Sequence, residues 1–286
     1  MKQQYILTNT NSFNPKHIFE CGQCFRWNEN PDGSYTGVFG NNVLNVKQEN
    51  NNIIFSGICD GNIEEICKDY FDLDTDYNQI KDKLSKIDDN LKQGIQYGEG
   101  IRILKQDLWE MIISYIISAN NNIPRIKKII ERMSEKYGNK LELDGEIFYT
   151  FPTVEQLSKA TVEELRGLGL GFRDKRVYET TQLILNKEID LDYLKSIQDS
   201  NNLREELNKL PGVGDKVADC IMLFSMKRFD VFPIDVWVRR VINDLYIKNE
   251  DETKVNKKEI RNLAETKYGK LAGIAQQYLF YWKREA

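Results

Sequence analysis

Lys216 and Asp235 are the residues of this sequence whose types and setting best fit covalent chemistry on a sugar. Lys216 lies in the segment 207–220, LNKLPGVGDKVADC, directly after a Pro-Gly-Val-Gly turn. A lysine amine can attack a sugar carbon and hold it as a Schiff base when burial or a neighbouring charge lowers its pKa. A solvated lysine, or one that touches a phosphate, is the alternative for an isolated residue of this type.

Asp235 follows in the segment 232–240, FPIDVWVRR, just before an amphipathic run. Its structural role would be to cap the N-terminus of a helix. A capping carboxylate can also face a reacting sugar, where it would stabilise positive charge at the anomeric carbon or move protons for Lys216. The two roles are compatible.

The turn before Lys216 predicts a helix-hairpin-helix. We expect a helix to end at Leu210 because Pro211 cannot continue it, and Gly212 and Gly214 permit a tight turn before the next helix. The N–H groups at that helix start can hold a DNA phosphate without any strongly basic surface.

The second helix of this hairpin should present two faces. Val217, Ile221 and Phe224 fall on one stripe that packs inward, while Lys216 and Cys220 are four residues apart and face the same space.

The charge of the chain limits how it can meet nucleic acid. The net charge is −4, and residues 1–100 hold 9 Lys and Arg against 15 Asp and Glu, whereas residues 101–286 hold 31 against 29. Proteins that coat nucleic acid by bulk electrostatics are usually strongly basic. Any contact with DNA should therefore be local and lie in the second part.

Cysteine use and hydropathy indicate the setting. The five cysteines are an odd number, and the first residues do not resemble an export signal, so we expect a reducing, intracellular environment. No run approaches 18 consecutive apolar residues, which argues against a membrane role. We expect a monomer, because no heptad pattern asks for a partner.

The pattern along the chain predicts an α+β protein. Alternating segments at 35–39, 43–46 and 53–55 are separated by turn signals and indicate an antiparallel meander. Helical spacing begins near Ile63, 74–94 reads as a charged connector with helix and loops, and helix follows helix from Asp107. We expect an N-terminal sheet domain over 1–100 and a helical domain over 101–286, with the hairpin at about 203–224.

Helix starts are marked by capping pairs. Asp107 with Glu110, Thr153 with Gln156 and Thr161 with Glu164 each place a capping side chain three residues before an acid or amide.

The hairpin with its lysine, followed by Pro233-Ile-Asp235-Val, resembles the helix-hairpin-helix DNA glycosylase superfamily. Further matches along the chain resemble one branch, the 8-oxoguanine DNA glycosylases of eukaryotic type with their bacterial relatives. The resemblance implies a bifunctional glycosylase and lyase that acts on duplex DNA, with Lys216 as nucleophile and Asp235 as its partner.

The segment 22–27, GQCFRW, is similar to the N-terminal motif of that branch, in which a glycine carbonyl accepts a hydrogen bond from the lesion. Oxidation at C8 turns N7 of guanine from an acceptor into a donor, so a fixed carbonyl attracts the lesion and repels the normal base. A simple turn glycine is the alternative for Gly22. Cys21 and Cys24 are interpreted as part of a strand, with no second pair to complete a zinc site.

The segment 118–125, SANNNIPR, is similar to the family segment that fills the gap left by a flipped nucleotide. The resemblance assigns that task to Asn120 and Arg125, and it assigns an aromatic wedge and a second arginine at the estranged base to Phe172 and Arg173. An asparagine-rich helix end and a packed phenylalanine are the alternatives.

The base pocket implied by the resemblance draws on distant segments. Gln276 would read the Watson–Crick edge, Phe280 and Cys220 would stack on the two faces of the base, and Pro233 would border it. Ordinary core packing is the alternative for the terminal helix.

Two residues depart from the human-type pattern of this branch. Trp237 replaces a histidine near the DNA backbone, and Phe224 replaces a methionine at the pocket wall.

No redox cofactor is expected, and no cysteine follows Cys220 to build the iron–sulfur loop of related endonucleases. The resemblance implies a structural cation, monovalent or divalent, on the backbone carbonyls of Asn208, Leu210 and Val213. Two rival functions remain at this point: an alkylated-base glycosylase that uses Asp235 alone, and a catalytically silent module that only grips DNA.

Overall fold

The computed structural model describes residues 2–8 and 12–285, and its N-terminal part is an antiparallel sheet. The strand order is β1-β5-β4-β3-β2, and every neighbouring pair is antiparallel. The predicted meander is confirmed as β3, β4 and β5. The strands are β1 (Gln3–Thr8), β2 (Trp27–Glu29), β3 (Tyr35–Phe39), β4 (Asn42–Glu49) and β5 (Asn52–Ile58).

The edge strand β1 has no counterpart among the sequence predictions. Its residues alternate between half-buried and exposed positions, and it pairs with β5, so that Gln3 lies opposite Gly57 and Thr8 opposite Asn52. A strand of this length with one moderately apolar face carries little local signal, and its pairing partner comes much later in the chain.

Short helices also belong to this part. The predicted connector over 74–94 forms two helices, each started by an aspartate cap, Asp76 and Asp88. The helices of this part are α1 (Pro15–Glu20), α2 (Ile63–Tyr70), α3 (Tyr77–Ser85) and α4 (Asp89–Tyr97). Of these, α1 and α2 contact strands of the sheet, whereas α4 contacts α3 and the C-terminal helix.

The remainder of the chain is mainly helical, and all three predicted helix starts are confirmed. Asp107 caps α5, while Thr153 and Thr161 each form a reciprocal capping box with the residue three positions later. The helices are α5 (Leu108–Ser118), α6 (Ile123–Tyr137), α7 (Val154–Leu157), α8 (Val162–Leu165), α9 (Asp174–Leu185), α10 (Leu191–Ser196), α11 (Ser200–Leu207), α12 (Asp215–Met226), α13 (Val236–Ile242), α14 (Lys257–Tyr268) and α15 (Ala272–Glu285).

The expectation of uninterrupted helices after Asp107 is wrong at one place. A hairpin of β6 (Lys140–Leu143) and β7 (Glu146–Tyr149) follows α6. Its turn residues Asp144 and Gly145 both have positive φ, 52° and 85°. An Asp-Gly pair between alternating apolar residues favours this tight turn, so the signal was present in the sequence.

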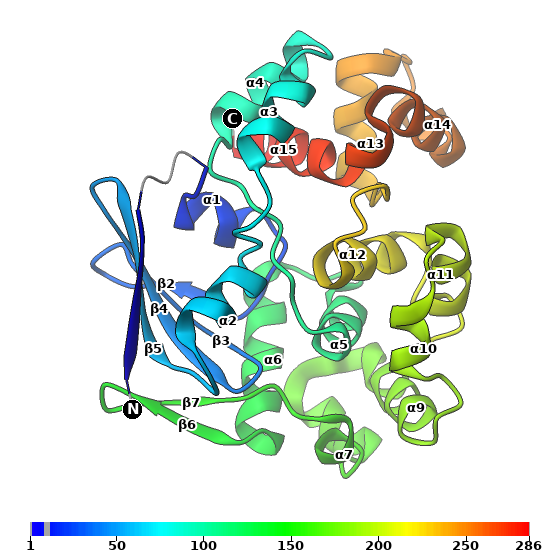
Figure 1. The fold of residues 1–286 in the computed structure, drawn as a ribbon. Coiled ribbons are helices and arrows are strands. Elements are labelled where there is room, and N and C mark those ends of the chain that lie inside the picture. The colour runs from blue at the N-terminus through cyan, green and yellow to red at the C-terminus, as the bar shows by residue number, and fades with distance from the viewer. Residues whose placement is uncertain (1, 9–11, 286) are drawn as a thin grey trace.

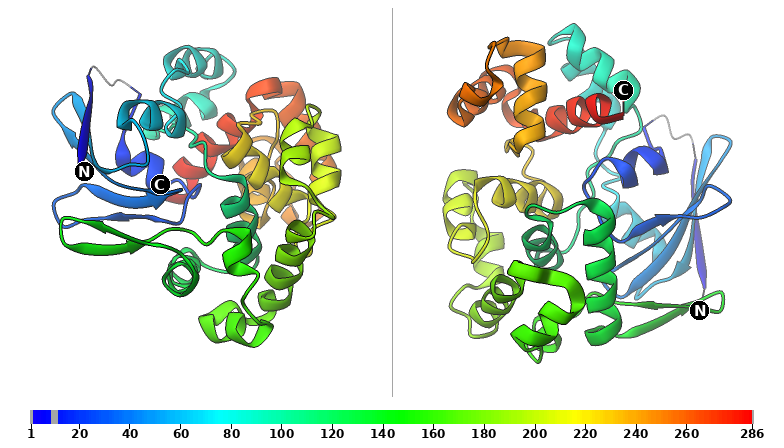
Figure 2. Two further views of the ribbon diagram at one scale, coloured as in Figure 1. Left: turned by 60° about the horizontal axis from the view of Figure 1, so that its bottom comes forward. Right: turned by 180° about the vertical axis from the view of Figure 1, so that it is seen from behind.

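The sheet and the helices lie side by side, and the C-terminal helix packs on a helix of the N-terminal part (Figure 1). In Figure 1 the C-terminal helix α15 returns to the N-terminal part, where it lies beside α4 and close to α1. Both views of Figure 2 keep the sheet on one side of the helical part. The predicted α+β architecture is confirmed. Among the described residues, no helix combines the length and apolar character needed to cross a bilayer.

The segment that joins the two parts is fixed by a buried arginine. Arg102 is 6% exposed, and its guanidinium donates to the backbone carbonyls of Phe71, Ser12, Asp72 and Thr75. Four carbonyl partners satisfy a guanidinium that would otherwise be costly to bury. This connection holds the sheet in one orientation against the helices.

Candidate active site

A cavity of about 740 Å³ opens between α5, α12, α13 and α15. Lys216 and Asp235, which the sequence predicts for one site, both line it. We group its lining residues by the elements that carry them. The hairpin wall is Lys216, Val217, Asp235, Val236 and Trp237, and the composite wall is Gly22, Phe25, Tyr115, Phe280 and Arg284. The remaining lining residues, 118–123 and Ile126, are called the rim.

The hairpin that carries Lys216 is tighter than predicted. Helix α11 ends at Leu207, and not at Leu210. The residues that follow form hydrogen bonds between positions three apart in the chain, such as that from Leu210 N–H to the Leu207 carbonyl, 3.1 Å, in place of the helical spacing of four. Gly212 has φ +88°, and a Cβ there would lie 2.7 Å from Arg176 Cδ. Only glycine fits this turn without strain.

Gly214 starts the second helix of the hairpin. It is the N-cap residue of α12, is exposed, and supplies no side-chain hydrogen bond to the first turn. The N–H groups of this turn are therefore left without a side-chain cap, which is the arrangement predicted for holding a phosphate.

Lys216 stands half-buried on the cavity face of α12. Its Nζ lies 5.4 Å from the centroid of the Tyr115 ring, and Cys220 follows one turn later on the same helix. Burial raises the pKa of Cys220 to about 11, so the thiol is protonated at neutral pH. Val217, Ile221 and Phe224 are buried, as the helical spacing predicts.

Asp235 caps α13, as its position predicts. Its Oδ1 accepts a hydrogen bond of 2.8 Å from Val238 N–H, which leaves Oδ2 outside the cap. The side chain is half-buried and lines the cavity. Because the cap fixes one oxygen, the carboxylate is held in one orientation toward the space beside Lys216.

The composite wall is formed where the loop between α1 and β2 approaches the C-terminal helix α15. Gly22 has φ +87°, and a Cβ at this position would lie 3.5 Å from the Phe280 ring and 3.4 Å from Arg284 Nη1. Gly22 is therefore a turn glycine and also a wall residue, so the two interpretations of this residue are compatible.

The loop around Gly22 is held by Gln23, a residue that the sequence analysis quoted without giving it a role. Its buried amide donates to the carbonyls of Ile18 and Arg102 at 2.9 and 2.8 Å, and its Oε1 accepts from Leu104 N–H at 2.8 Å. These bonds join the loop to the segment between the sheet and the helices.

The interpretation of Cys21 and Cys24 as strand residues is wrong. Residues 21–26 form bends between α1 and β2, and both thiols are buried in different apolar clusters. These bends carry the chain from α1 to β2 and bring Gly22 up to α15. All five cysteines lie within the described residues and are free thiols.

The rim contains the asparagine-rich segment. Asn120 is exposed and adopts φ +51°, directly after the Ala119 cap of α5, so it does stand at a helix end. Asn122 caps α6 by accepting from Arg125 N–H, and the Arg125 guanidinium donates to the Gly169 carbonyl at 3.2 Å.

Phe172 and Arg173 have opposite environments. Phe172 is 56% exposed, so it is not a packed core residue. Arg173 is 2% exposed, and its guanidinium donates to the carbonyls of Ala119, Asn120 and Leu170. Arg173 therefore holds the Asn120 loop in this structure, and its contact with an estranged base stays a prediction.

Three of the predicted pocket residues lie behind the cavity lining. Cys220 and Gln276 are each 4% exposed, and Pro233 is buried next to the Asp235 cap. Gln276 Oε1 accepts from the neighbouring Gln277 amide at 2.8 Å. Phe280, one turn later on α15, is half-buried and lines the cavity.

Tyr115 was not singled out from the sequence, although it lies at the centre of the site. It is 2% exposed, and its ring stacks on Phe224 at 5.8 Å between centroids. The apolar run of α5 contains no signal for a functional residue, because the pattern alone does not distinguish a tyrosine of the site from a tyrosine packed in the core.

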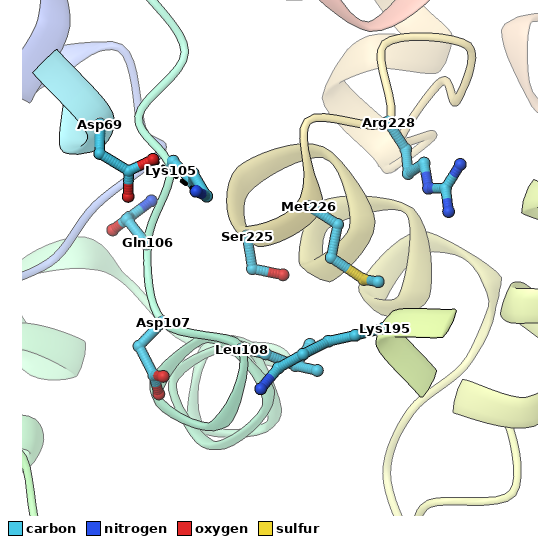
Figure 3. Close-up of a pocket in the computed structure, with 9 residues that line it drawn as sticks. All are labelled: Asp69, Lys105, Gln106, Asp107, Leu108, Lys195, Ser225, Met226 and Arg228. Atoms are coloured by element: carbon cyan, nitrogen blue, oxygen red, sulfur yellow. Dashed lines mark hydrogen bonds and ion pairs between the residues drawn. The ribbon is translucent and has the colours of Figure 1, made fainter. Parts of the chain in front are cut away.

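A second cavity lies at the other end of α5 and contains none of the predicted site residues (Figure 3). Its cations are already paired: Lys105 Nζ lies 2.5 Å from the Asp69 carboxylate, and Arg228 donates to the carbonyls of Ile197 and Gln198. Within the described residues, no group of three or more His, Cys, Asp or Glu side chains is arranged to hold a metal ion.

Two family models together cover most of the chain. Residues 5–112 match the N-terminal domain of 8-oxoguanine DNA glycosylase, and residues 113–267 match the HhH-GPD superfamily of base excision DNA repair proteins.

Known proteins are similar over nearly the whole length. The N-glycosylase/DNA lyase of Saccharomyces cerevisiae is 33% identical over 89% of this chain and 72% of its own length. The apo structure of the Clostridium acetobutylicum 8-oxoguanine glycosylase/lyase superimposes with a TM-score of 0.92, at 44% identity over 99% of this chain and 98% of that one. The structure of the same enzyme with double-stranded DNA containing cytosine opposite 8-oxoguanine gives 0.93, at 44% identity over 100% and 98% of the two chains.

Proposed function

The chain belongs to the 8-oxoguanine DNA glycosylase/lyase family, and we propose that Lys216 and Asp235 carry out its reaction. The enzyme excises 8-oxoguanine from double-stranded DNA in base excision repair and cleaves the strand at the resulting abasic site. The observation that carries the assignment of these residues is that both side chains line one cavity, and Gly22 and Phe280 line the same cavity.

Lys216 acts as the nucleophile. Its Nζ, once deprotonated, forms a bond to C1′ of the flipped nucleotide while the N-glycosidic bond breaks, and the base leaves with the bonding electrons and takes up a proton. Opening of the sugar ring gives a Schiff base between Nζ and C1′. Loss of a C2′ proton then expels the 3′ phosphate by β-elimination.

Asp235 assists at the same carbon. Its carboxylate either stabilises the positive charge that develops at C1′ or accepts the proton that Lys216 must lose. The cap on α13 supports this role, because it holds Oδ1 in place and leaves Oδ2 available.

The base pocket uses groups from several elements. The Gly22 carbonyl accepts the N7–H of the lesion, Phe280 and Cys220 cover its two faces, Gln276 reads its Watson–Crick edge, and Pro233 supports the wall. Gly22 and Phe280 lie together at the cavity, which supports their part of this assignment. Gln276 and Cys220 would have to contact the base from just behind the lining.

DNA is held at the hairpin and at the rim. The uncapped N–H groups at Gly212 and Gly214 bind a backbone phosphate. Asn120 and Arg125 fill the gap left by the flipped nucleotide, and Phe172 acts as a wedge. Arg173 contributes at the estranged base through the Asn120 loop that it orders.

No redox cofactor takes part in this chemistry. A cation at the hairpin would use the backbone carbonyls of Asn208, Leu210 and Val213, which are hard oxygen ligands at the end of α11. The Leu210 carbonyl already accepts a 3.0 Å hydrogen bond from Val213 N–H, so a cation would use its second lone pair. The cation would hold a DNA phosphate against the turn at Gly212 and Gly214.

The division into a sheet domain over 1–100 and a helical domain over 101–286 is part of this proposal. The two domains act as a unit, because α4 packs on α15 and the Gly22 loop completes the cavity.

Borohydride trapping tests the assignment. Wild type, Lys216→Gln and the control Lys140→Gln, an exposed lysine on β6, are incubated with duplex DNA that carries one 8-oxoguanine. A covalent complex is expected with wild type and the control and not with Lys216→Gln. Excision without any covalent complex would instead favour a glycosylase that uses Asp235 alone, and binding without excision would favour a silent DNA-binding module.

A further inference from the structure

Tyr115 is the residue of the composite wall that contacts Lys216 of the hairpin wall. Its ring lies beneath Lys216 Nζ of the hairpin wall and stacks on Phe224, while its hydroxyl lies 3.4 Å from the Gly22 carbonyl oxygen of the composite wall. The Phe25 ring packs edge-on against it, with 5.5 Å between the ring centroids. A single buried side chain thus contacts both the proposed nucleophile and the loop of the proposed lesion acceptor.

The direction of the hydroxyl hydrogen bond follows from its partners. The Tyr115 hydroxyl reaches the carbonyl oxygens of Gly22 and Gln23, at 3.4 and 3.5 Å, and a carbonyl can only accept. The Gln23 carbonyl already receives a 2.8 Å hydrogen bond from Gln106 Nε2. Each of these carbonyl oxygens has two lone pairs, and the Gly22 oxygen is the nearer of the two to the Tyr115 hydroxyl.

Burial keeps this proton in place. Burial raises the pKa of Tyr115 well above its ordinary value, so the hydroxyl is a donor throughout the physiological range. A carbonyl oxygen has two lone pairs, so the Gly22 oxygen can accept from Tyr115 and from a ligand at once.

We propose that Tyr115 is a positioning residue for base selection, whose hydroxyl orients the Gly22 carbonyl toward the lesion N7–H and whose ring supports Lys216. This inference rests on the proposed function of the site. With 8-oxoguanine, the carbonyl accepts both hydrogen bonds. With guanine, N7 carries a lone pair that would face the lone pairs of the Gly22 oxygen and be repelled. If the Tyr115 hydroxyl donated to N7 instead, the Gly22 carbonyl would lose its hydrogen bond.

The effects of the Tyr115 hydroxyl and of the Tyr115 ring can be distinguished by comparing two substrates. Cleavage of a preformed abasic site needs Lys216 but no base pocket. Tyr115→Phe keeps the ring and should lower kcat/KM for 8-oxoguanine by about fivefold to tenfold, the value of one hydrogen bond, while abasic-site cleavage stays within about twofold. Tyr115→Leu removes the ring as well and should lower both rates.

The matched control is Tyr278→Phe. Tyr278 is fully buried on α15, and its hydroxyl has no hydrogen-bond partner among the described residues, so the same substitution should leave both rates unchanged. Thermal unfolding of each variant shows that the fold is retained.

A second measurement removes catalysis altogether. In a Lys216→Gln background, the ratio of the dissociation constants for guanine and 8-oxoguanine duplexes should fall by about fivefold when Tyr115→Phe is added. An unchanged ratio, or an equal loss on abasic and 8-oxoguanine DNA, would overturn the proposal. Failure of wild type to excise the lesion would refute the proposed function instead, and the binding ratio would still decide the role of Tyr115.

Discussion

The hairpin wall and the composite wall enclose the same cavity but are built in different ways. The hairpin wall comes from two helix starts that are close in sequence, and its orientation is set by backbone features: the turn at Gly212 and the cap at Asp235. The composite wall combines residues from the loop between α1 and β2, from α5 and from the last helix, α15. Chemistry on the sugar is thus placed by local structure, while selection of the base depends on how the Gly22 loop packs against α15.

This difference predicts that substitutions should separate the two activities. A change in the hairpin wall should affect both base excision and abasic-site cleavage, because both need the nucleophile. A change in the composite wall should affect base excision alone, because an abasic site presents no base.

The largest effect is expected for Asp235→Asn in the hairpin wall. Asparagine caps helices as well as aspartate, so the free energy of unfolding should change by less than about 0.5 kcal/mol. Loss of the negative charge should lower excision and abasic-site cleavage together, by about a hundredfold or more. Single-turnover kinetics on the two substrates measure this.

The control for this prediction is Asp107→Asn. Asp107 caps α5 through Glu110 N–H at 2.9 Å and does not line the cavity, so this variant should keep wild-type rates. Retention of either activity by Asp235→Asn would contradict a shared role of the carboxylate.

A smaller and selective effect is expected for Gly22→Ala in the composite wall. An alanine at φ +87° is strained by about 1–2 kcal/mol, so the backbone at Gly22 should shift, although its Cβ would only reach ordinary contact with Phe280 and Arg284. Displacement of the carbonyl should lower 8-oxoguanine excision by about tenfold, with abasic-site cleavage unchanged.

Gly33→Ala provides the comparison for that variant. Gly33 has φ +78°, and a Cβ there would meet nothing within 4 Å, so the substitution brings similar backbone strain without touching the site. It should lower the Tm without changing kcat/KM. Equal loss of excision in both glycine variants would show that strain, and not the wall, is responsible.

The smallest effect is expected outside both walls, for Phe172→Ala. Phe172 is 56% exposed, so the Tm should not change. Loss of an aromatic ring that stacks on DNA should weaken duplex binding by about fivefold in a fluorescence titration. Tyr193→Ala, at a tyrosine that is 57% exposed on α10, should bind DNA as wild type does, and a similar loss in both variants would argue against a specific wedge.

Several elements could be predicted because their signals are local. The strands β3 to β5, the three capped helix starts and the inward stripe of α12 each follow from residues within one or two turns or strands. The edge strand β1 and the β6–β7 hairpin were missed: β1 has a weak pattern, and the hairpin is a short interruption between helices. The bends at Cys21 and Cys24 have no local signal that separates them from the start of the adjacent strand β2.

The site shows the same division. The sequence by itself determined that Lys216 and Cys220 share a face, that Asp235 caps a helix and that a glycine turn precedes the nucleophile, because helical periodicity and cap geometry are properties of a few adjacent residues. Only the tertiary structure decided that Arg173 is buried under the Asn120 loop, that Gln23 fixes the Gly22 loop and that Tyr115 touches both walls. These contacts depend on the packing of distant segments into one core, which no local pattern specifies.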